Sequence, residues 1–133
     1  MTEDNHPRSV LLGAQARTGI LPVCDHYSGI PSRMVQSLEL QEELTREFGA
    51  CVMDVTLDCE DGAPVGREAA HAALVAELVA NGARSARVAV RVHALDHPAF
   101  AEDVRILLLR SGDKLRHIML PKIESLEDVD RAA

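Results

Sequence analysis

The fold is indicated most clearly by residues 51–62, which read CVMDVTLDCEDG. Residues 51–58 are largely apolar and rich in β-branched side chains, as is typical of a buried strand, and a glycine and a proline end the run. The strand therefore ends in the carboxylates Asp58, Glu60 and Asp61. In parallel β/α folds, polar residues that follow strands in this way line the active site.

Segments on both sides of this stretch repeat the same pattern. Further strands are predicted at residues 20–25, 86–93 and 117–120, and the loop after the first begins at His26. Helices are predicted at residues 31–48, 67–79, 98–111 and from Ser125 onward. Residues 1–19 are polar and are expected to form an arm or a lead-in helix before a domain that spans 20–133. Strands that alternate with helices predict a parallel α/β sheet.

Local signals give finer expectations for three of these helices. Ala70, Leu74 and Leu78 fall on one face of the second helix and are expected to point into the core. Asp96 is expected to cap the third helix, whose apolar positions are Phe100, Val104 and Leu108. The pair Ser125 and Asp128 has the spacing of a capping box at the start of the fourth helix.

The length of the chain bears on which parallel fold is present. An eight-stranded barrel built from such units needs about 250 residues, and this chain has 133. A four-stranded parallel sheet would leave apolar strand edges unpaired. We therefore expect α/β architecture in the form of the first four β/α units of a (β/α)8 TIM barrel, truncated at the C-terminus.

Composition excludes some classes of function. Acidic residues outnumber basic ones by 21 to 14, so a nucleic-acid backbone would be repelled, whereas a small anionic substrate can still bind where a few cations gather in one cleft. The three cysteines lack metal-binding spacing and suit reduced thiols. Neither a signal peptide nor a membrane-spanning run is recognisable, so we expect a cytoplasmic protein without membrane contact.

Polar residues at the strand ends form the candidate site. Arginine is suited to hold a carboxylate by two hydrogen bonds, and carboxylates suit Mg²⁺, so an enolate-forming reaction could use both. A single strand-end polar residue is as often a helix cap, but four strands in succession favour a shared site. The residues are Asp25, His26, Asp58, Glu60, Asp61, Arg91, His93, Lys122 and Glu124.

Three motifs occur in order along the chain: LDCEDG at residues 57–62, VRV at 90–92 and LPKIES at 120–125. Pro64, Arg67 and Ala70 follow the first motif as a proline and a helix start. The set resembles the aldolase and citrate lyase β-subunit family, also called HpcH/HpaI, over about residues 20–133. The chain departs from the family pattern by Gly62 in place of alanine, by Arg67 in place of lysine and by His93 in place of asparagine.

The resemblance implies a Mg²⁺-dependent carbon–carbon lyase or aldolase. Its substrate would be a 3-hydroxyacyl thioester, such as a citryl-, malyl- or citramalyl-CoA, or a 2-keto-acid aldol, cleaved through a metal-stabilised enolate. Complete members form homo-oligomers, commonly trimers or hexamers. The resemblance assigns catalysis and the binding of a substrate carboxylate or carbonyl to Arg91, and the water shell of the metal to Glu60 and Asp61. Further candidates for substrate binding are Lys122, Arg67 and His26.

The direct metal ligands of the family lie on later strands, beyond residue 133, so the chain alone is expected to be inactive. Alternatives are a non-catalytic remnant or assembly subunit that pairs with a complementary half-barrel, and another phosphoenolpyruvate or pyruvate barrel enzyme. Lys122 could form a Schiff base, but an ion pair with Glu124 or with an acid after strand two is favoured. Metal binding by His93 and His97 is disfavoured because Pro98 interrupts a helix through both.

Overall fold

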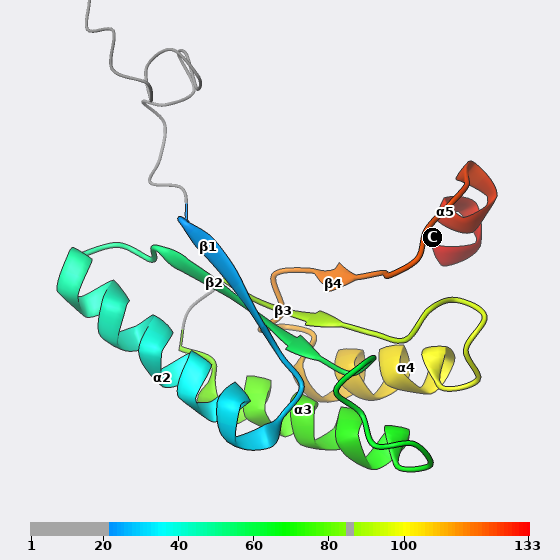
Figure 1. Ribbon diagram of the computed structural model, residues 1–133, viewed down its shortest axis with the longest axis horizontal. Helices are drawn as coiled ribbons and strands as arrows, with labels where there is room; N and C mark the ends of the chain where they lie inside the picture. The colour runs from blue at the N-terminus through cyan, green and yellow to red at the C-terminus, as the bar shows by residue number, and fades with distance from the viewer. Residues whose placement is uncertain (1–21, 85–86) are drawn as a thin grey trace, which may run out of the picture.

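The computed structural model describes residues 22–84 and 87–133, so the predicted arm at 1–19 lies outside the described residues. Four strands form one parallel sheet in the order β1-β2-β3-β4, and a helix follows each strand (Figure 1). The strands are β1 (Cys24–Ser28), β2 (Met53–Asp58), β3 (Val88–Arg91) and β4 (Ile118–Met119). The helices are α2 (Pro31–Phe48), α3 (Glu68–Gly82), α4 (Phe100–Ser111) and α5 (Leu126–Ala132). The predicted order of four β/α units is confirmed.

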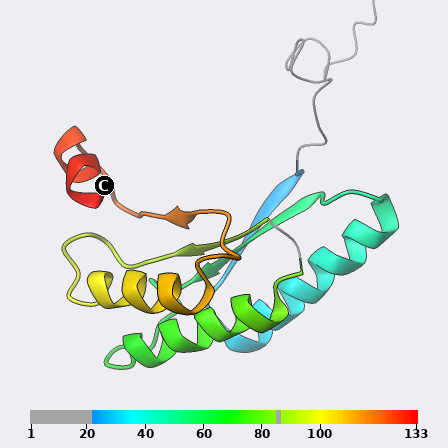
Figure 2. The same cartoon turned by 180° about the vertical axis from the view of Figure 1, so that it is seen from behind.

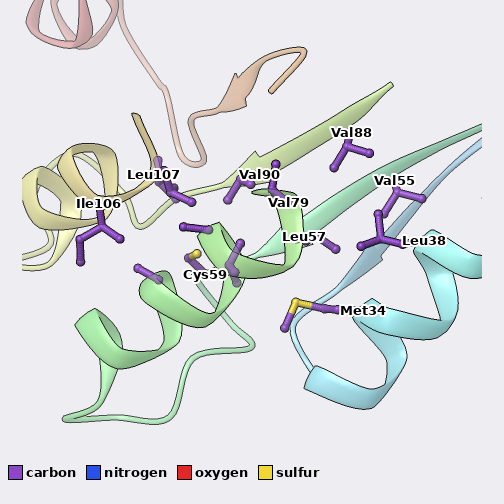
Figure 3. Packing of buried hydrophobic residues seen from close by; sticks show 14 of the residues in the cluster. Met34, Leu38, Val55, Leu57, Cys59, Val79, Val88, Val90, Ile106 and Leu107 are labelled. Atoms are coloured by element: carbon purple, nitrogen blue, oxygen red, sulfur yellow. The ribbon is translucent and has the colours of Figure 1, made fainter. Parts of the chain in front are cut away.

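The helices α2, α3 and α4 cover one face of the sheet, and that face is apolar (Figure 2). Val55 and Leu57 of β2 and Val88 and Val90 of β3 are completely buried there, against helix residues that include Val79 (Figure 3). Burying one such side chain contributes about 1.5–3 kcal/mol, so this layer is the main source of stability. None of the helices in the described parts of the chain is long and apolar enough to cross a membrane.

The opposite face of the sheet is polar, because side chains alternate between the two faces of a strand. Asp54, Thr56 and Asp58 occupy every second position of β2 and face away from the apolar layer. Arg87 Nε donates to Asp54 Oδ1 at 2.5 Å, and Thr56 Oγ1 donates to Asp25 at 3.0 Å. In a closed barrel this face would point to the interior. Charged groups in an interior need partners, and the cross-strand pairs provide them.

Strand β1 begins later in the chain than the sequence predicted. It spans Cys24–Ser28, so the expected strand at 20–25 and the expected loop from His26 onward are wrong; residues 20 and 21 lie outside the described part. The register aligns Cys24 with Met53 and Ser28 with Leu57. Backbone pairing with β2 therefore sets the strand, and its side chains Asp25 and Tyr27 lie on the polar face of the sheet, which an apolar-run criterion does not recognise.

The buried faces of α3 and α4 are partly as predicted. The predicted positions that pack against the core, partly buried, are Leu74, Leu78, Phe100 and Val104. Ala70, by contrast, is exposed. On α4, Leu108 is 54% exposed, whereas Leu107 is completely buried. Both helices are apolar on two overlapping stripes, so the packing of α3 between α2 and α4 decides which stripe is buried. The core residues of α3 are His71, Ala72, Val75, Ala76 and Val79.

The helix starts are partly as predicted. The capping box of Ser125 and Asp128 is present at the start of α5 and confirms the prediction. Asp96 does not cap α4, because the N-cap residue is Ala99 and makes no side-chain hydrogen bond. The carboxylate of Asp96 instead accepts a hydrogen bond from Arg131 Nη2 at 2.6 Å. Asp96 therefore links the start of α4 to α5.

Two glycines bring the loops after β1 and β2 into direct backbone contact. A Cβ atom on Gly62 would lie 2.3 Å from the Cα atom of Gly29, and one on Gly29 would lie 2.4 Å from the Cα atom of Gly62. Backbone atoms cannot rotate away as a side chain can. Glycine at both positions therefore allows the two loops to meet next to the strand-end site.

Replacing Gly62 with alanine is expected to lower the free energy of unfolding by about 1–3 kcal/mol, because the added methyl group forces two backbones apart. Urea denaturation of the purified chain measures this. Gly49→Asn is the matched control, since Gly49 has φ +67° with nothing within 4 Å of its would-be Cβ, and asparagine tolerates this conformation. Equal losses for both variants would contradict the close contact.

Candidate active site at the strand ends

The centre of the site is a pair of residues at the carboxyl ends of β2 and β3. Asp58 and Arg91 are register partners in the parallel ladder. Arg91 Nε donates to Asp58 Oδ1 at 2.9 Å, and Nη2 donates to Asp58 Oδ2 at 2.8 Å. Asp58 also accepts the backbone N–H groups of Glu60 at 2.9 Å and Gly62 at 3.2 Å. One buried carboxylate therefore holds both the arginine and the loop that follows β2.

Two further acids and a lysine complete the cluster. Arg91 Nη2 lies 2.9 Å from Asp61 Oδ2, and Nη1 lies 3.2 Å from Glu60 Oε2. Lys122 Nζ, from the segment after β4, lies 2.6 Å from Glu60 Oε1. The Asp61 side chain is 73% exposed, whereas those of Asp58 and Glu60 are 7% exposed. The outermost acid is thus the one that a ligand can most easily displace.

These contacts shift the protonation equilibria of the site. Burial alone raises the pKa of Asp58, but the hydrogen bonds from Arg91 and from the Glu60 N–H outweigh it, so the pKa lies below its ordinary value. The Asp58 carboxylate raises the pKa of Arg91, and Glu60 raises the pKa of Lys122. Each of these three shifts favours the charged form, so Asp58, Arg91 and Lys122 are all ionised at neutral pH.

Lowering the pH is expected to reduce the free energy of unfolding, because Asp58 becomes protonated. Its carboxyl binds a proton less readily in the folded chain, so its contribution to stability is complete above the unfolded pKa of about 4 and is lost as the pH falls through the folded pKa. Asp58→Asn removes this titration. Between about pH 5 and pH 3, the free energy of unfolding should therefore fall less in the variant than in the wild type. Equal pH dependence in urea titrations would contradict the assignment.

Tyr27 is a site residue that the sequence analysis missed. Its ring lies under the guanidinium of Arg91, with 5.9 Å between the Arg91 Cζ atom and the ring centroid, and its hydroxyl donates to Met119 Sδ at 3.3 Å. Burial and the neighbouring Asp25 raise the pKa of Tyr27. The missed signal is the alternation of Asp25 and Tyr27 along β1, which was obscured because that strand was placed too early.

Lys122 shows which of its two predicted roles the geometry favours. A Schiff-base lysine needs a lowered pKa, whereas the pKa of Lys122 is raised, and its side chain is 68% exposed. The structure shows the ion pair with Glu60 instead, while the backbone N–H of Glu124 donates to Asp128. Lys122 has a φ of 58°, a strained value for a residue with a side chain. The contacts of Lys122, among them the ion pair with Glu60, therefore stabilise this backbone conformation at the site.

His26 and Arg67 are not brought to the cluster. His26 Nδ1 lies 2.9 Å from Ser37 Oγ of α2, on the helix side of β1, whereas Tyr27 points to the Arg91 side. Arg67 precedes α3 and is exposed. Both residues line separate surface pockets, of about 360 Å³ for His26 and about 230 Å³ for Arg67. Substrate binding by either stays a prediction that this arrangement does not support.

The residues after β3 form a second polar group. His93 Nδ1 lies 2.6 Å from Asp103 Oδ2 of α4, and both side chains are buried. The ring of His97 stacks on that of His93, with 4.2 Å between centroids. His93 therefore anchors the β3–α4 loop to its helix, and the pair with His97 is a ring stack.

The described residues do not fit a direct metal site. Within residues 22–84 and 87–133, no group of three or more His, Cys, Asp or Glu side chains is arranged to hold a metal ion. Glu60 and Asp61, the acids predicted for the water shell, are bound by Arg91 and Lys122. Any magnesium would need ligands other than these carboxylates in their present contacts.

The cysteines of the chain differ in environment: Cys24 is exposed, Cys51 is partly buried and Cys59 is buried. Burial raises the pKa of Cys59. Iodoacetamide is therefore expected to label Cys24 in the native protein at least about 100-fold faster than Cys59, which should react only after unfolding in urea. Mass spectrometry of peptides after timed labelling measures both rates. Comparable native rates would contradict the burial of Cys59 beneath α3 and α4.

Comparison with solved structures gives a clear similarity. Neither a scan against protein-family models nor a search of the curated proteins gave a match. Among solved structures, the chain is similar to the crystal structure of a citrate lyase from Burkholderia xenovorans LB400, with 46% sequence identity and a TM-score of 0.73. The match covers 84% of this chain and 34% of that chain, so the chain spans about a third of the length of this relative. The partial-barrel fold is confirmed, and the similarity to a citrate lyase agrees with the family that the strand-end motifs resemble.

Proposed function

We propose that this chain forms the Arg91-bearing wall of a carbon–carbon lyase active site. The substrate class is a 3-hydroxyacyl thioester with a free carboxylate, such as a citryl-, malyl- or citramalyl-thioester, or a related 2-keto-acid aldol. Cleavage of the carbon–carbon bond in such a compound leaves negative charge on an enolate, which a fixed cation stabilises. The similarity to a citrate lyase supports the reaction class.

The observation that carries the proposal is the way in which Arg91 is held. Asp58 fixes one edge of the guanidinium through Nε and Nη2, so the arginine is preoriented before any ligand arrives. The remaining contact of Nη2, with Asp61, involves a largely exposed carboxylate and is weakened by solvent. A substrate carboxylate could take the place of Asp61 while Asp58 keeps the arginine in position.

The proposal assigns no chemical step to a metal among these residues, because the described carboxylates are occupied by cations. Magnesium would supply further stabilisation of the enolate, with direct ligands from strand ends that this chain does not contain. Within this chain, Arg91 binds the anionic group, Asp58 orients Arg91, and Lys122 neutralises Glu60. We therefore expect the 133-residue chain alone to show no lyase turnover with Mg²⁺.

A second candidate function is assembly without catalysis, in which the chain pairs with a complementary half-barrel. In the described part of the chain, β1 and β4 each pair on one side only, and no helix covers the polar face of the sheet. Size-exclusion chromatography tests this candidate. A stable monomer would count against obligate pairing.

A chimaera tests the lyase proposal, since it supplies the rest of a barrel. The matched segment of the Burkholderia citrate lyase is replaced by the corresponding segment of this chain, and cleavage of citryl-, malyl- and citramalyl-thioesters is followed with and without Mg²⁺. We expect Mg²⁺-dependent turnover of at least one of these substrates. A folded chimaera that cleaves none of them, next to an active parent enzyme, would overturn the proposal.

A further inference from the structure

We propose that His71 is a positioning residue that sets the place of Arg91 by acting through Asp58. The chain of contacts runs from α3 to β2 and from there to β3. This role deepens the proposed function, and it rests on that function only in assuming that Arg91 binds substrate. The positioning itself can be measured without turnover.

The first contact joins α3 to the end of β2. His71 lies in the first turn of α3 and is buried. Its Nε2 lies 2.9 Å from the backbone oxygen of Asp58, and because a carbonyl only accepts, the Nε2–H group donates. Asp58 is the last residue of β2 and has a register partner in β3 but none in β1. The hydrogen bond from His71 therefore helps to fix the Asp58 backbone where strand pairing is one-sided.

The second set of contacts joins the end of β2 to Arg91, through the backbone of Cys59 and the side chain of Asp58. The N–H of Cys59 donates to the backbone oxygen of Arg91 at 2.8 Å, and the Asp58 carboxylate holds the guanidinium through two hydrogen bonds. A shift of the Asp58 backbone would therefore move the carboxylate that orients Arg91. The bond from His71 opposes such a shift.

Two features make His71 more than a core residue. Its bond falls on Asp58, whose carboxylate accepts hydrogen bonds from two nitrogens of Arg91. The same Asp58 carbonyl also lies 3.0 Å from the would-be Cβ of Gly29, so it has little room to move. Loss of the donor would leave this buried carbonyl unsatisfied, and the backbone would move to reach water or another donor. This backbone movement would displace the Asp58 carboxylate and with it the guanidinium of Arg91.

The chain offers a matched control at the other end of the same strand. Gln41 of α2 is buried, and its Nε2 donates to the backbone oxygens of Met53 at 2.8 Å and Arg87 at 3.0 Å. This is also a bond from a helix side chain to the backbone of β2, but it lies at the amino end, away from Arg91. Gln41→Leu should lower stability without disturbing the site.

The experiment is NMR spectroscopy on the full 133-residue chain, which reads the titration of the Asp58 carboxyl and the hydrogen exchange of the Arg91 Nε–H group. In His71→Leu, we expect the measured pKa of Asp58 to rise by about one unit and the Arg91 exchange to become about tenfold faster. His71→Gln, whose amide can reach the same carbonyl, should restore both values. Gln41→Leu should leave both unchanged.

The proposal is overturned if His71→Leu loses stability while Asp58 and Arg91 behave as they do in Gln41→Leu. If His71→Leu does not fold, the same readings on His71→Asn decide, because its shorter amide cannot reach the carbonyl of Asp58. Failure of the lyase proposal is a separate result. A chimaera without turnover, together with the expected NMR changes, would reject the reaction and leave the positioning role in place.

Discussion

Replacing Asp58 with leucine is expected to lower the free energy of unfolding by about 3 kcal/mol, because it leaves a guanidinium without its main partner. Removing one member of a buried ion pair costs about 3–5 kcal/mol, and Arg91 keeps Glu60 and Asp61, so the lower end applies. Leucine also removes the acceptor for two backbone N–H groups in the loop after β2. Urea denaturation at neutral pH measures the loss.

A surface ion pair provides the control for this prediction. Glu102 and Arg105 bond to each other on the exposed side of α4. Glu102→Ala should leave the urea denaturation curve almost unchanged, since exposed pairs contribute little. A similarly small change for Asp58→Leu would show that the strand-end pair does not hold this part of the fold.

Replacing Arg91 with glutamine in the chimaera is expected to lower kcat/KM by about 100- to 1000-fold, because a charge-assisted contact to the substrate is lost while the Asp58 carboxylate is left without its cation. Arg91→Lys should recover little of this loss, since an ammonium group cannot bind both oxygens of Asp58 in the geometry of a guanidinium. Steady-state kinetics on a cleaved thioester measure the effect.

The matched comparison for Arg91 is Arg87, which directly precedes β3 and lies on the same polar face of the sheet. Arg87 pairs with Asp54 at the amino end of the strands, away from the site. Arg87→Gln is expected to leave kcat/KM within about threefold of the parent chimaera, provided that the variant folds. If the Arg91 and Arg87 variants lost activity equally, the loss would follow from disruption of the polar sheet face and not from substrate binding at Arg91.

The alternating pattern and the strand-end acids were enough to predict the parallel β/α order and the meeting of residues from β2, β3 and the segment after β4. Asp58, Glu60, Asp61, Arg91 and Lys122 do gather as expected, because the carboxyl ends of parallel strands share one edge of the sheet. The spacing of LDCEDG and VRV carried this information, since both motifs directly follow buried runs.

What the sequence could not supply was the pairing within the cluster and the exact frame of β1. Acids after a strand can bind metal, substrate or a neighbouring cation, and only the distances show that Arg91 and Lys122 engage them. The frame of β1 depends on hydrogen bonds to β2, which leave no signal in the apolar pattern of the sequence. His26 was therefore predicted at the site, and Tyr27 was missed.

Binding of a substrate carboxylate at Arg91 can be seen directly in a crystal structure of the chimaera with a small dicarboxylate. We expect a ligand carboxylate within hydrogen-bond distance of the Arg91 guanidinium, with Asp61 displaced and Asp58 still bound to Nε. A dicarboxylate bound elsewhere in the barrel mouth, with Asp58, Glu60 and Asp61 all remaining on Arg91, would contradict it.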